Sequence, residues 1–260
     1  MSVTNIEKII QYLIPVSKEN IEIDGNIVES HINQIVLTKR FFSIDGCNMC
    51  GHCCPPEHNT YVQFEYDAIM EFERDGLEKL GLPVENIDDL RENLKTFEHI
   101  INGKVVKLYE FRKKYPLLYL PRKGKEVKRC YWVHKFDDGR IGCGIYPLRS
   151  LTCRMPHMRF YYNNRTGHSV ISTREFGRNW ALGCEMEFKQ PETEQEFIIS
   201  KKDRIEKLKY LQKVADELNV DTYVPEIIKY VEAIPFRGYE FCLKRNILEP
   251  VPKKLIVRSI

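Results

Sequence analysis

Residues 47–56 read Cys-Asn-Met-Cys-Gly-His-Cys-Cys-Pro-Pro, and this stretch constrains the fold more than any other. A tight turn at Cys-x-x-Cys spacing brings two sulfur atoms to the same side of the backbone, where both can bind one metal ion. Cys47, Cys50 and Cys53 repeat that spacing, and Gly51 suits the positive φ that such a turn needs. Because four thiols within eight residues have no packing rationale, the stretch predicts a metal site.

Cys53 and Cys54 are adjacent, and successive side chains on extended backbone point to opposite sides. We therefore expect them to face two metal centres, or one centre and the protein core. The predicted ligands that lie farther along the chain are Cys130, Cys143, Cys153 and Cys184. With the first four they give eight thiols, enough for one four-thiolate centre or for two. Cys242, between Phe241 and Leu243, is expected to be a buried core residue.

Thiolate sulfur suits both zinc and iron–sulfur clusters, so only the spacing can separate the two. Structural zinc sites usually pair two Cys-x-x-Cys or His knuckles, and this chain has no second knuckle. Many 4Fe–4S clusters are bound by a run of three cysteines with a distant fourth, and a proline such as Pro55 often follows the last cysteine of the run. The ferredoxin spacing itself is not met. We expect a 4Fe–4S cluster, with zinc as the alternative.

Two arginines near the later cysteines, Arg149 and Arg154, are candidate cofactor-binding residues. A guanidinium there would offset the negative charge of a thiolate-ligated cluster or bind an anionic substrate. Ordinary surface charge is the alternative, since arginine is common on protein surfaces. No catalytic residue can be named from the sequence.

The whole pattern resembles the CxxCxxCC cysteine-cluster family, which is described as a zinc- or iron-chelating domain. The matching positions lie between residues 47 and 184, about half of the chain: Cys47, Cys50, Gly51, Cys53, Cys54, Arg129, Cys130, Cys143, Ile145, Tyr146, Arg149, Cys153, Arg154 and Cys184. Family members often carry proline after the arginine that corresponds to Arg149, whereas this chain has Ser150. A distantly related group, the flagellin lysine-N-methylases, implies an iron–sulfur centre used with S-adenosylmethionine.

Two classes of function are compatible with such a centre. One is an enzyme that uses the cluster in redox or cluster-dependent modification chemistry, for example S-adenosylmethionine-dependent protein lysine methylation. The other is a non-catalytic protein, either an electron carrier or a structural zinc-binding interaction module. The Gly-x-Gly-x-x-Gly, Gly-x-Ser-x-Gly and His-Glu-x-x-His motifs are absent, as is the Cys-x-x-x-Cys-x-x-Cys of radical S-adenosylmethionine enzymes. We expect a protein partner or protein substrate, which the sequence does not identify.

The composition excludes several other classes of protein. Hydrophobic residues make up 43% and charged residues 30% of the 260, which is typical of a globular chain and not of a disordered one. Lys and Arg number 40 against 37 Asp and Glu, a balance that disfavours nucleic acid as a partner. No window approaches the ~18 apolar residues of a membrane span, and the amino end lacks a secretion signal. We expect a cytoplasmic protein with reduced thiols.

The residue pattern predicts an α+β fold: a cysteine-rich metal-binding core with central short antiparallel strands, flanked by N- and C-terminal helices. We divide the chain into a lead-in (1–40), the core (41–188) and a helical tail (189–260) packed on the core. Helices are expected near residues 6–14, 66–76, 85–101, 146–153, 193–218 and 223–233. Strands are expected near 21–23, 61–64, 104–111, 117–120, 127–136, 157–162 and 168–173, with turns at 24–25 and 137–139. The pattern of 27–42 fits either a helix or a strand.

Overall fold

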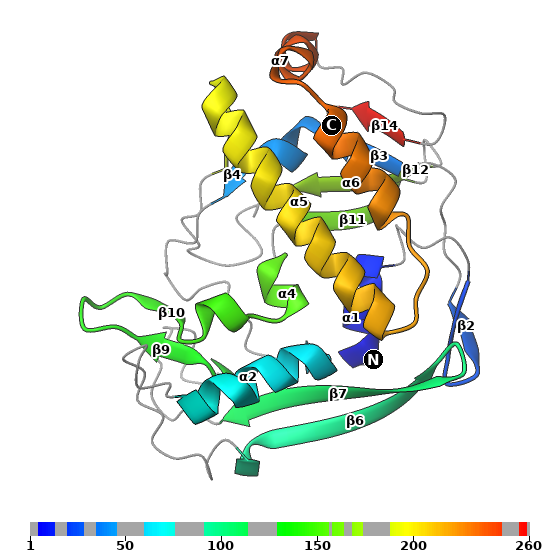
Figure 1. The fold of residues 1–260 in the computed structure, drawn as a ribbon, viewed down its shortest axis with the longest axis vertical. Helices are drawn as coiled ribbons and strands as arrows, with labels where there is room; N and C mark the ends of the chain where they lie inside the picture. The colour runs from blue at the N-terminus through cyan, green and yellow to red at the C-terminus, as the bar shows by residue number, and fades with distance from the viewer. Residues whose placement is uncertain are drawn as a thin grey trace, which may run out of the picture.

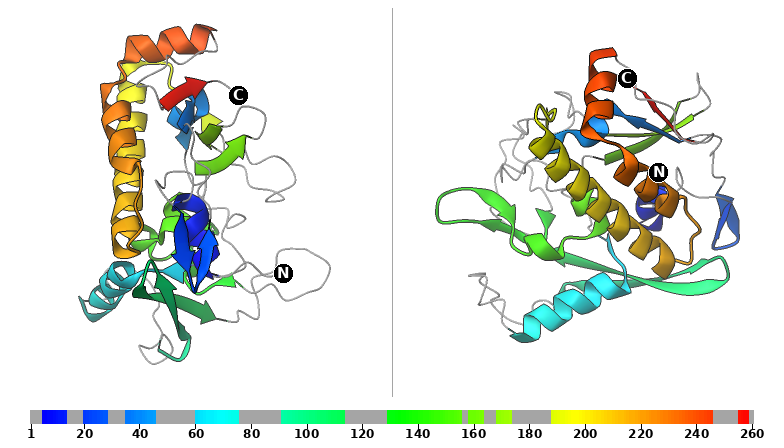
Figure 2. Two further views of the ribbon diagram at one scale, coloured as in Figure 1. Left: turned by 90° about the vertical axis from the view of Figure 1, so that its right-hand side faces the viewer. Right: turned by 45° about the horizontal axis from the view of Figure 1, so that its top comes forward.

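The computed structural model describes residues 5–13, 20–28, 35–45, 60–75, 91–113, 129–155, 158–163, 168–173, 188–245 and 255–258. It contains helices and an antiparallel sheet, which confirms the α+β class (Figure 1). In the left-hand view of Figure 2, the helices within residues 194–233 lie side by side as one layer. The strands in this view lie to one side of that layer.

The larger sheet is antiparallel, with the strand order β2-β1-β6-β7-β5 and with β8 also paired to β7. Its strands are β1 (Ile21–Ile23), β2 (Asn26–Val28), β5 (Thr60–Tyr61), β6 (Leu94–Ile101), β7 (Lys104–Lys113) and β8 (Arg129–Cys130). The predicted turn between β1 and β2 is confirmed, since Asp24 and Gly25 have φ values of 48° and 78°. Thr60–Tyr61 is extended as expected, but a helix already begins at Gln63.

The helix predicted over residues 85–101 is wrong from residue 94 on, because Leu94–Ile101 is strand β6, whereas residues 91–92 are helical. The turn Asn102-Gly103 has φ values of 49° and 74°, the combination that closes a tight hairpin. It pairs β6 with β7 over eight residues and turns Phe97, His99 and Ile101 inward. Pairing with a strand that follows the turn therefore overrides the helical spacing of the apolar residues.

A second sheet joins strands that are far apart in the chain, in the order β11-β12-β3-β14. Its strands are β3 (Ile35–Thr38), β11 (Met158–Asn163), β12 (His168–Thr173) and β14 (Leu255–Arg258). The β11–β12 pairing is antiparallel and confirms the predicted hairpin, whereas β3 is parallel to both β12 and β14. This sheet thus adds parallel pairs to the antiparallel strands that were expected. Within residues 27–42, for which a helix or a strand was expected, Ile35–Thr38 is a strand and Lys39–Phe42 is a 3-10 helix.

The helices expected near 6–14, 193–218 and 223–233 are confirmed as α1 (Asn5–Leu13), α5 (Glu194–Glu217) and α6 (Val224–Ala233). The structure adds a helix that was not expected, α7 (Phe236–Arg245). A capping box fixes the start of α5, because Thr193 accepts from the Glu196 N–H while the Glu196 carboxylate accepts from the Thr193 N–H. Ile6, Ile9 and Leu13 of α1 are buried in the same core as the inner face of α5.

A smaller, mainly aromatic cluster packs beneath α2 (Gln63–Asp75), the helix predicted near 66–76. We call the following buried residues the aromatic cluster: Tyr61, Ile69, Tyr109, Phe111, Tyr131, Trp132 and Ile145. The Tyr66 ring of α2 stacks on Tyr109 of β7 with the ring centroids 4.0 Å apart. The cluster thereby packs α2 against the end of β7 that pairs with β8.

Next to the aromatic cluster lies a hairpin of β9 (Val133–Lys135) and β10 (Ile141–Cys143). Its predicted turn is confirmed, with Gly139 at φ 85°. The short helix predicted after Tyr146 is present as a 3-10 turn, η4 (Tyr146–Leu148), followed by α4 (Leu151–Arg154). The strand predicted at 117–120 lies outside the described residues.

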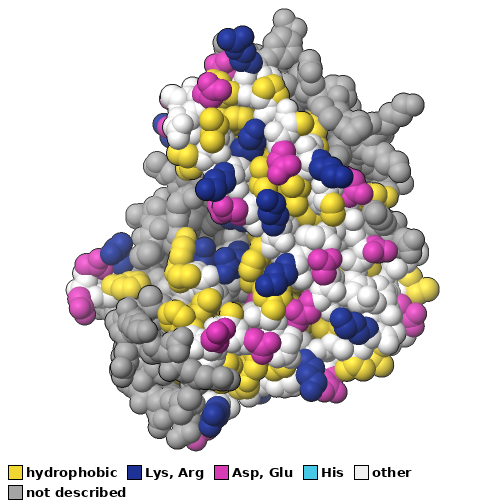
Figure 3. Space-filling model, viewed as in Figure 1, with side chains coloured by type: hydrophobic (Ala, Val, Ile, Leu, Met, Phe, Trp, Pro, Cys, Tyr) yellow, Lys and Arg dark blue, Asp and Glu magenta, His cyan; other side chains and the backbone are white. Residues whose placement is uncertain are grey.

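On the face shown in Figure 3, basic and acidic side chains are interspersed over the helices and form no large patch of one sign among the described residues. No described helix combines the length and the apolar composition needed to cross a lipid bilayer.

Candidate metal centre

The structure describes the surroundings of some predicted ligands and not of others. Cys47, Cys50, Cys53, Cys54 and Cys184 lie outside the described residues. Cys130 is described only by its backbone in β8, and Cys242 only by its backbone in α7. Cys143 ends β10 and Cys153 lies in α4; both are half-buried and neither belongs to a disulfide. Within the described ranges no three Cys, His, Asp or Glu side chains come together as a metal site.

The first predicted ligand and the last are close in sequence to one short strand pair. β4 (Ile44–Asp45) pairs antiparallel with β13 (Phe188–Lys189), and Asp45 is opposite Phe188. Cys47 follows Asp45 by two residues, and Cys184 precedes Phe188 by four. Because the strands are antiparallel, both cysteine-bearing segments leave this pair at the same end.

Strand β5, which follows the four-cysteine segment in the sequence, lies close to the backbone of Cys130. Thr60, six residues after Cys54, is opposite Glu110 of β7, and Cys130 is opposite Arg112 of the same strand. With about 3.3 Å per residue along a strand and about 4.8 Å between strands, the Cα atoms of Thr60 and Cys130 are at most about 12 Å apart.

The β9–β10 hairpin sets the position of Cys143. Cys143 is opposite Val133, and the next residue, Gly144, donates its N–H to the Trp132 carbonyl over 2.8 Å. The Cys143 side chain packs against the aromatic cluster, which contains Trp132. Backbone pairing therefore brings Cys143 to the chain segment that starts at Cys130.

A buried carboxylate connects the helix after β5 to the helix that carries Cys153. Glu65 is 3% exposed and accepts hydrogen bonds from the Val62 N–H at 2.9 Å and from the Leu151 N–H at 2.8 Å. Val62 precedes α2, and Leu151 begins α4. Because free N–H groups at both helix starts need an acceptor, one side chain satisfies both and fixes α4 against α2.

The same carboxyl group has an unusual protonation equilibrium. Burial raises the pKa of Glu65 to about 7, while hydrogen bonds from the Tyr210 hydroxyl and from the Val62 and Leu151 N–H groups oppose that rise. The Tyr210 hydroxyl of α5 donates to Glu65 Oε1. Burial next to this carboxyl also raises the pKa of the Tyr210 phenol far above its usual value.

The two candidate cofactor-binding arginines flank α4 and are engaged with the protein itself. Arg154 donates to the backbone carbonyls of Arg149 and Pro147, and its guanidinium lies 4.2 Å from the Tyr210 ring centroid. Arg149 donates to the Tyr146 carbonyl, and its guanidinium lies 3.5 Å from the Tyr146 ring centroid. These contacts order the loop before Cys153. Both guanidinium groups are partly exposed.

A fully buried arginine fixes the chain just before the four-cysteine segment. Arg204 of α5 is 0% exposed and donates to the carbonyls of Phe41 and Ser43, while Ser200 donates to the carbonyl of Phe42. These carbonyls belong to η2 (Lys39–Phe42) and to the residue that leads into β4. The start of the predicted metal segment is therefore held by α5, more than 150 residues later in the chain.

Sequence reasoning missed Glu65, Tyr210 and Arg204. Glu65 carries one signal, an acidic side chain in the first turn of a helix, which indicates a helix start but not burial. Tyr210 and Arg204 lie in a run of alternating Lys and Glu, which has the pattern of a solvated helix face. Only packing of α5 on the sheets shows that these two side chains point inward.

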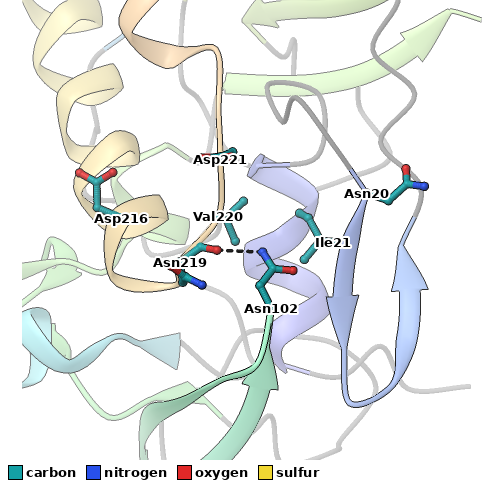
Figure 4. Close-up of a pocket in the computed structure, with 7 residues that line it drawn as sticks. All are labelled: Asn20, Ile21, Asn102, Asp216, Asn219, Val220 and Asp221. Atoms are coloured by element: carbon teal, nitrogen blue, oxygen red, sulfur yellow. Dashed lines mark hydrogen bonds between the residues drawn. The ribbon is translucent and has the colours of Figure 1, made fainter.

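A cavity of about 480 Å³ lies at the carboxyl end of α5 (Figure 4). It is lined by amides, two carboxylates and two aliphatic side chains: Asn20, Ile21, Asn102, Asp216, Asn219, Val220 and Asp221. The Asn102 amide, drawn with a dashed line in Figure 4, donates to the Asn219 carbonyl over 2.8 Å. None of these described lining residues is a cysteine.

The described residues around Cys130, Cys143 and Cys153 fit a thiolate-ligated metal. Cys143 and Cys153 are half-buried thiols, and an aromatic cluster that limits solvent access packs against Cys143. The indole Nε1–H of Trp132 is buried and has no hydrogen-bond partner among the described residues, as expected for a donor whose acceptor belongs to such a site. Comparison of the chain with protein-family models, with curated proteins and with solved structures found no match.

Proposed function

We propose that this chain is a cysteine-ligated metal protein whose favoured cofactor is a 4Fe–4S cluster. The observation that carries the proposal is the spacing of Cys47, Cys50, Cys53 and Cys54, four thiols that no packing argument explains. Cys130, Cys143, Cys153 and Cys184 complete the proposed ligand set. An iron–sulfur cluster supplies one-electron transfer, or an iron atom that binds substrate where one coordination position is open.

Strand pairing supports this ligand set, because it brings together the backbone next to cysteines that are distant in sequence. The β4–β13 pair joins Asp45, two residues before Cys47, to Phe188, four residues after Cys184. Strand β7 pairs both with Thr60, six residues after Cys54, and with Cys130. The β9–β10 hairpin brings Cys143 to the chain segment that starts at Cys130. A metal with ligands from several segments needs this arrangement, since the ligands must converge without long loops.

The protein's own residues would hold the centre and control its surroundings. Glu65 and Arg154 order α4, which carries Cys153, and Arg204 orders the backbone before Cys47. The aromatic cluster would exclude water from one side of the site, which strengthens electrostatic interactions there. Arg149 and Arg154 would contribute positive charge near a centre whose thiolates are negative.

Metal analysis tests the proposal directly. We expect protein purified without oxygen to be brown and to contain iron and acid-labile sulfide. Cys50→Ser is expected to lose metal and folding stability together, because the free energy of metal binding also stabilises the fold. Cys242→Ser is the matched control, since Cys242 stands outside the spacing pattern, and it should keep the metal content of the wild type.

Three results would count against the proposal. Zinc in place of iron and sulfide would support the structural zinc module and reject the iron–sulfur cluster. Protein without stoichiometric metal would reject both cofactors. Equal metal content in Cys50→Ser and the wild type would remove Cys50 from the ligand set.

A further inference from the structure

Trp132 is the one described residue whose buried side-chain N or O atom has no hydrogen-bond partner among the described residues. The residue is 6% exposed, so water reaches little of the indole ring. Buried N–H groups in proteins are nearly always paired, and each exception calls for an explanation. The Trp132 Nε1–H, which has no hydrogen-bond partner among the described residues, therefore needs an explanation.

The described surroundings of the ring offer apolar contacts. The Phe111 ring crosses the indole edge to face with centroids 5.1 Å apart, and the Tyr131 ring does so at 4.7 Å. The Trp132 carbonyl is already paired with the Gly144 N–H. The ring is thus held firmly in place, while its only polar atom lacks a described acceptor.

Two of the proposed metal ligands lie next to Trp132 along the backbone. Cys130 precedes it by two residues, and Cys143 immediately precedes Gly144, whose N–H binds the Trp132 carbonyl. The Cys143 side chain also packs against the aromatic cluster that includes Trp132. A thiolate sulfur is a hydrogen-bond acceptor that this region can supply.

We propose that the Trp132 Nε1–H donates a hydrogen bond to a cysteine sulfur of the metal centre and raises its reduction potential. The inference rests on the proposed iron–sulfur function and adds a residue that tunes the centre without binding the metal. A hydrogen bond withdraws electron density from the sulfur and stabilises the more negative, reduced state. Without this donor, the reduced state is less favoured.

The experiment uses the full-length protein purified without oxygen and compares Trp132→Phe with Trp180→Phe. Phe keeps an aromatic ring and lacks the N–H, and Trp180 is the only other tryptophan in the chain. We expect Trp132→Phe to keep its iron and sulfide but to have a more negative reduction potential than the wild type. Trp180→Phe should keep the wild-type potential.

A spectroscopic measurement makes the test independent of whether Trp132→Phe folds. In Trp180→Phe labelled with tryptophan that carries ¹⁵N only in the indole ring, the only labelled nitrogen is that of the Trp132 indole. Pulsed electron paramagnetic resonance of the reduced centre should then detect a ¹⁵N coupling. An absent coupling in this variant, or an unchanged potential in iron-loaded Trp132→Phe, would overturn the inference and leave the proposed cluster intact. A wild type without iron and sulfide would overturn the proposed function and this inference with it.

Discussion

Replacing Tyr210 with Phe should destabilise the protein more at pH 8 than at pH 5.5. The substitution removes only the hydroxyl that donates to Glu65, while the ring that lies beneath the Arg154 guanidinium remains. The Val62 and Leu151 N–H groups still donate to the carboxyl. The same hydroxyl also lies 3.4 Å from the Arg149 carbonyl, a neutral acceptor whose loss is the same at both pH values. The difference between the two pH values therefore reports the hydrogen bond to Glu65.

The size of the effect follows from the protonation of Glu65. The folded pKa of about 7 lies above the ordinary value of 4.5, so the folded protein binds this proton more tightly than the unfolded chain. This contribution to stability is complete below pH 4.5 and is lost as the pH rises through 7, a change of about 3 kcal/mol in the wild type. At pH 8 the variant loses a hydrogen bond to a charged carboxylate, which lowers the free energy of unfolding by about 1.5–3 kcal/mol. At pH 5.5 it loses a hydrogen bond to a neutral carboxyl group, which lowers that free energy by about 0.5–1.5 kcal/mol. The extra loss at pH 8 is about 1 kcal/mol.

Urea denaturation followed by circular dichroism, under reducing conditions at both pH values, measures these free energies. Tyr239→Phe is the matched control, because the Tyr239 hydroxyl donates to the neutral Gln190 amide over 2.8 Å. Its loss should be the same at pH 5.5 and pH 8. An equal loss at both pH values for Tyr210→Phe would refute the assignment of Glu65 as a group that titrates near neutrality.

Two further predictions test the packing that positions the proposed centre. Arg204→Met should lower the free energy of unfolding, measured by urea denaturation, by at least about 2 kcal/mol, because the carbonyls of Phe41 and Ser43 lose their buried donor. Lys202→Met, at an exposed position of the same helix, is the control and should change this free energy by less than about 0.5 kcal/mol. Ile101→Thr should cost about 2 kcal/mol or more, while Ile100→Thr should cost about 0.5 kcal/mol or less, since Ile101 is 0% and Ile100 is 51% exposed. Similar losses at Ile100 and Ile101 would show that the register of β6 is wrong.

Helices with clear ends and hairpins with glycine turns could be predicted from local sequence. The capping box at Thr193 and Glu196 defines the start of α5, and the turns at Gly25 and Gly139 fix two hairpins. Residues 94–101 could not be predicted in this way, because their apolar spacing fits a helix and pairing with β7 makes them a strand. The parallel partners of β3 come from residues 168–173 and 255–258, which no local pattern connects.

The sequence by itself determined that four thiols crowd into residues 47–54 and that helices follow residue 193, because both are properties of neighbouring residues. Tertiary structure alone decided which polar side chains fix the described segments that precede and follow those thiols in the sequence. Glu65 contacts Leu151 and Tyr210, and Arg204 contacts the backbone before β4, across 86 to 163 positions of sequence. Whether a charged group is buried depends on partners that the fold brings together. In the Lys- and Glu-rich sequence of α5, the same pattern contains both exposed and buried side chains.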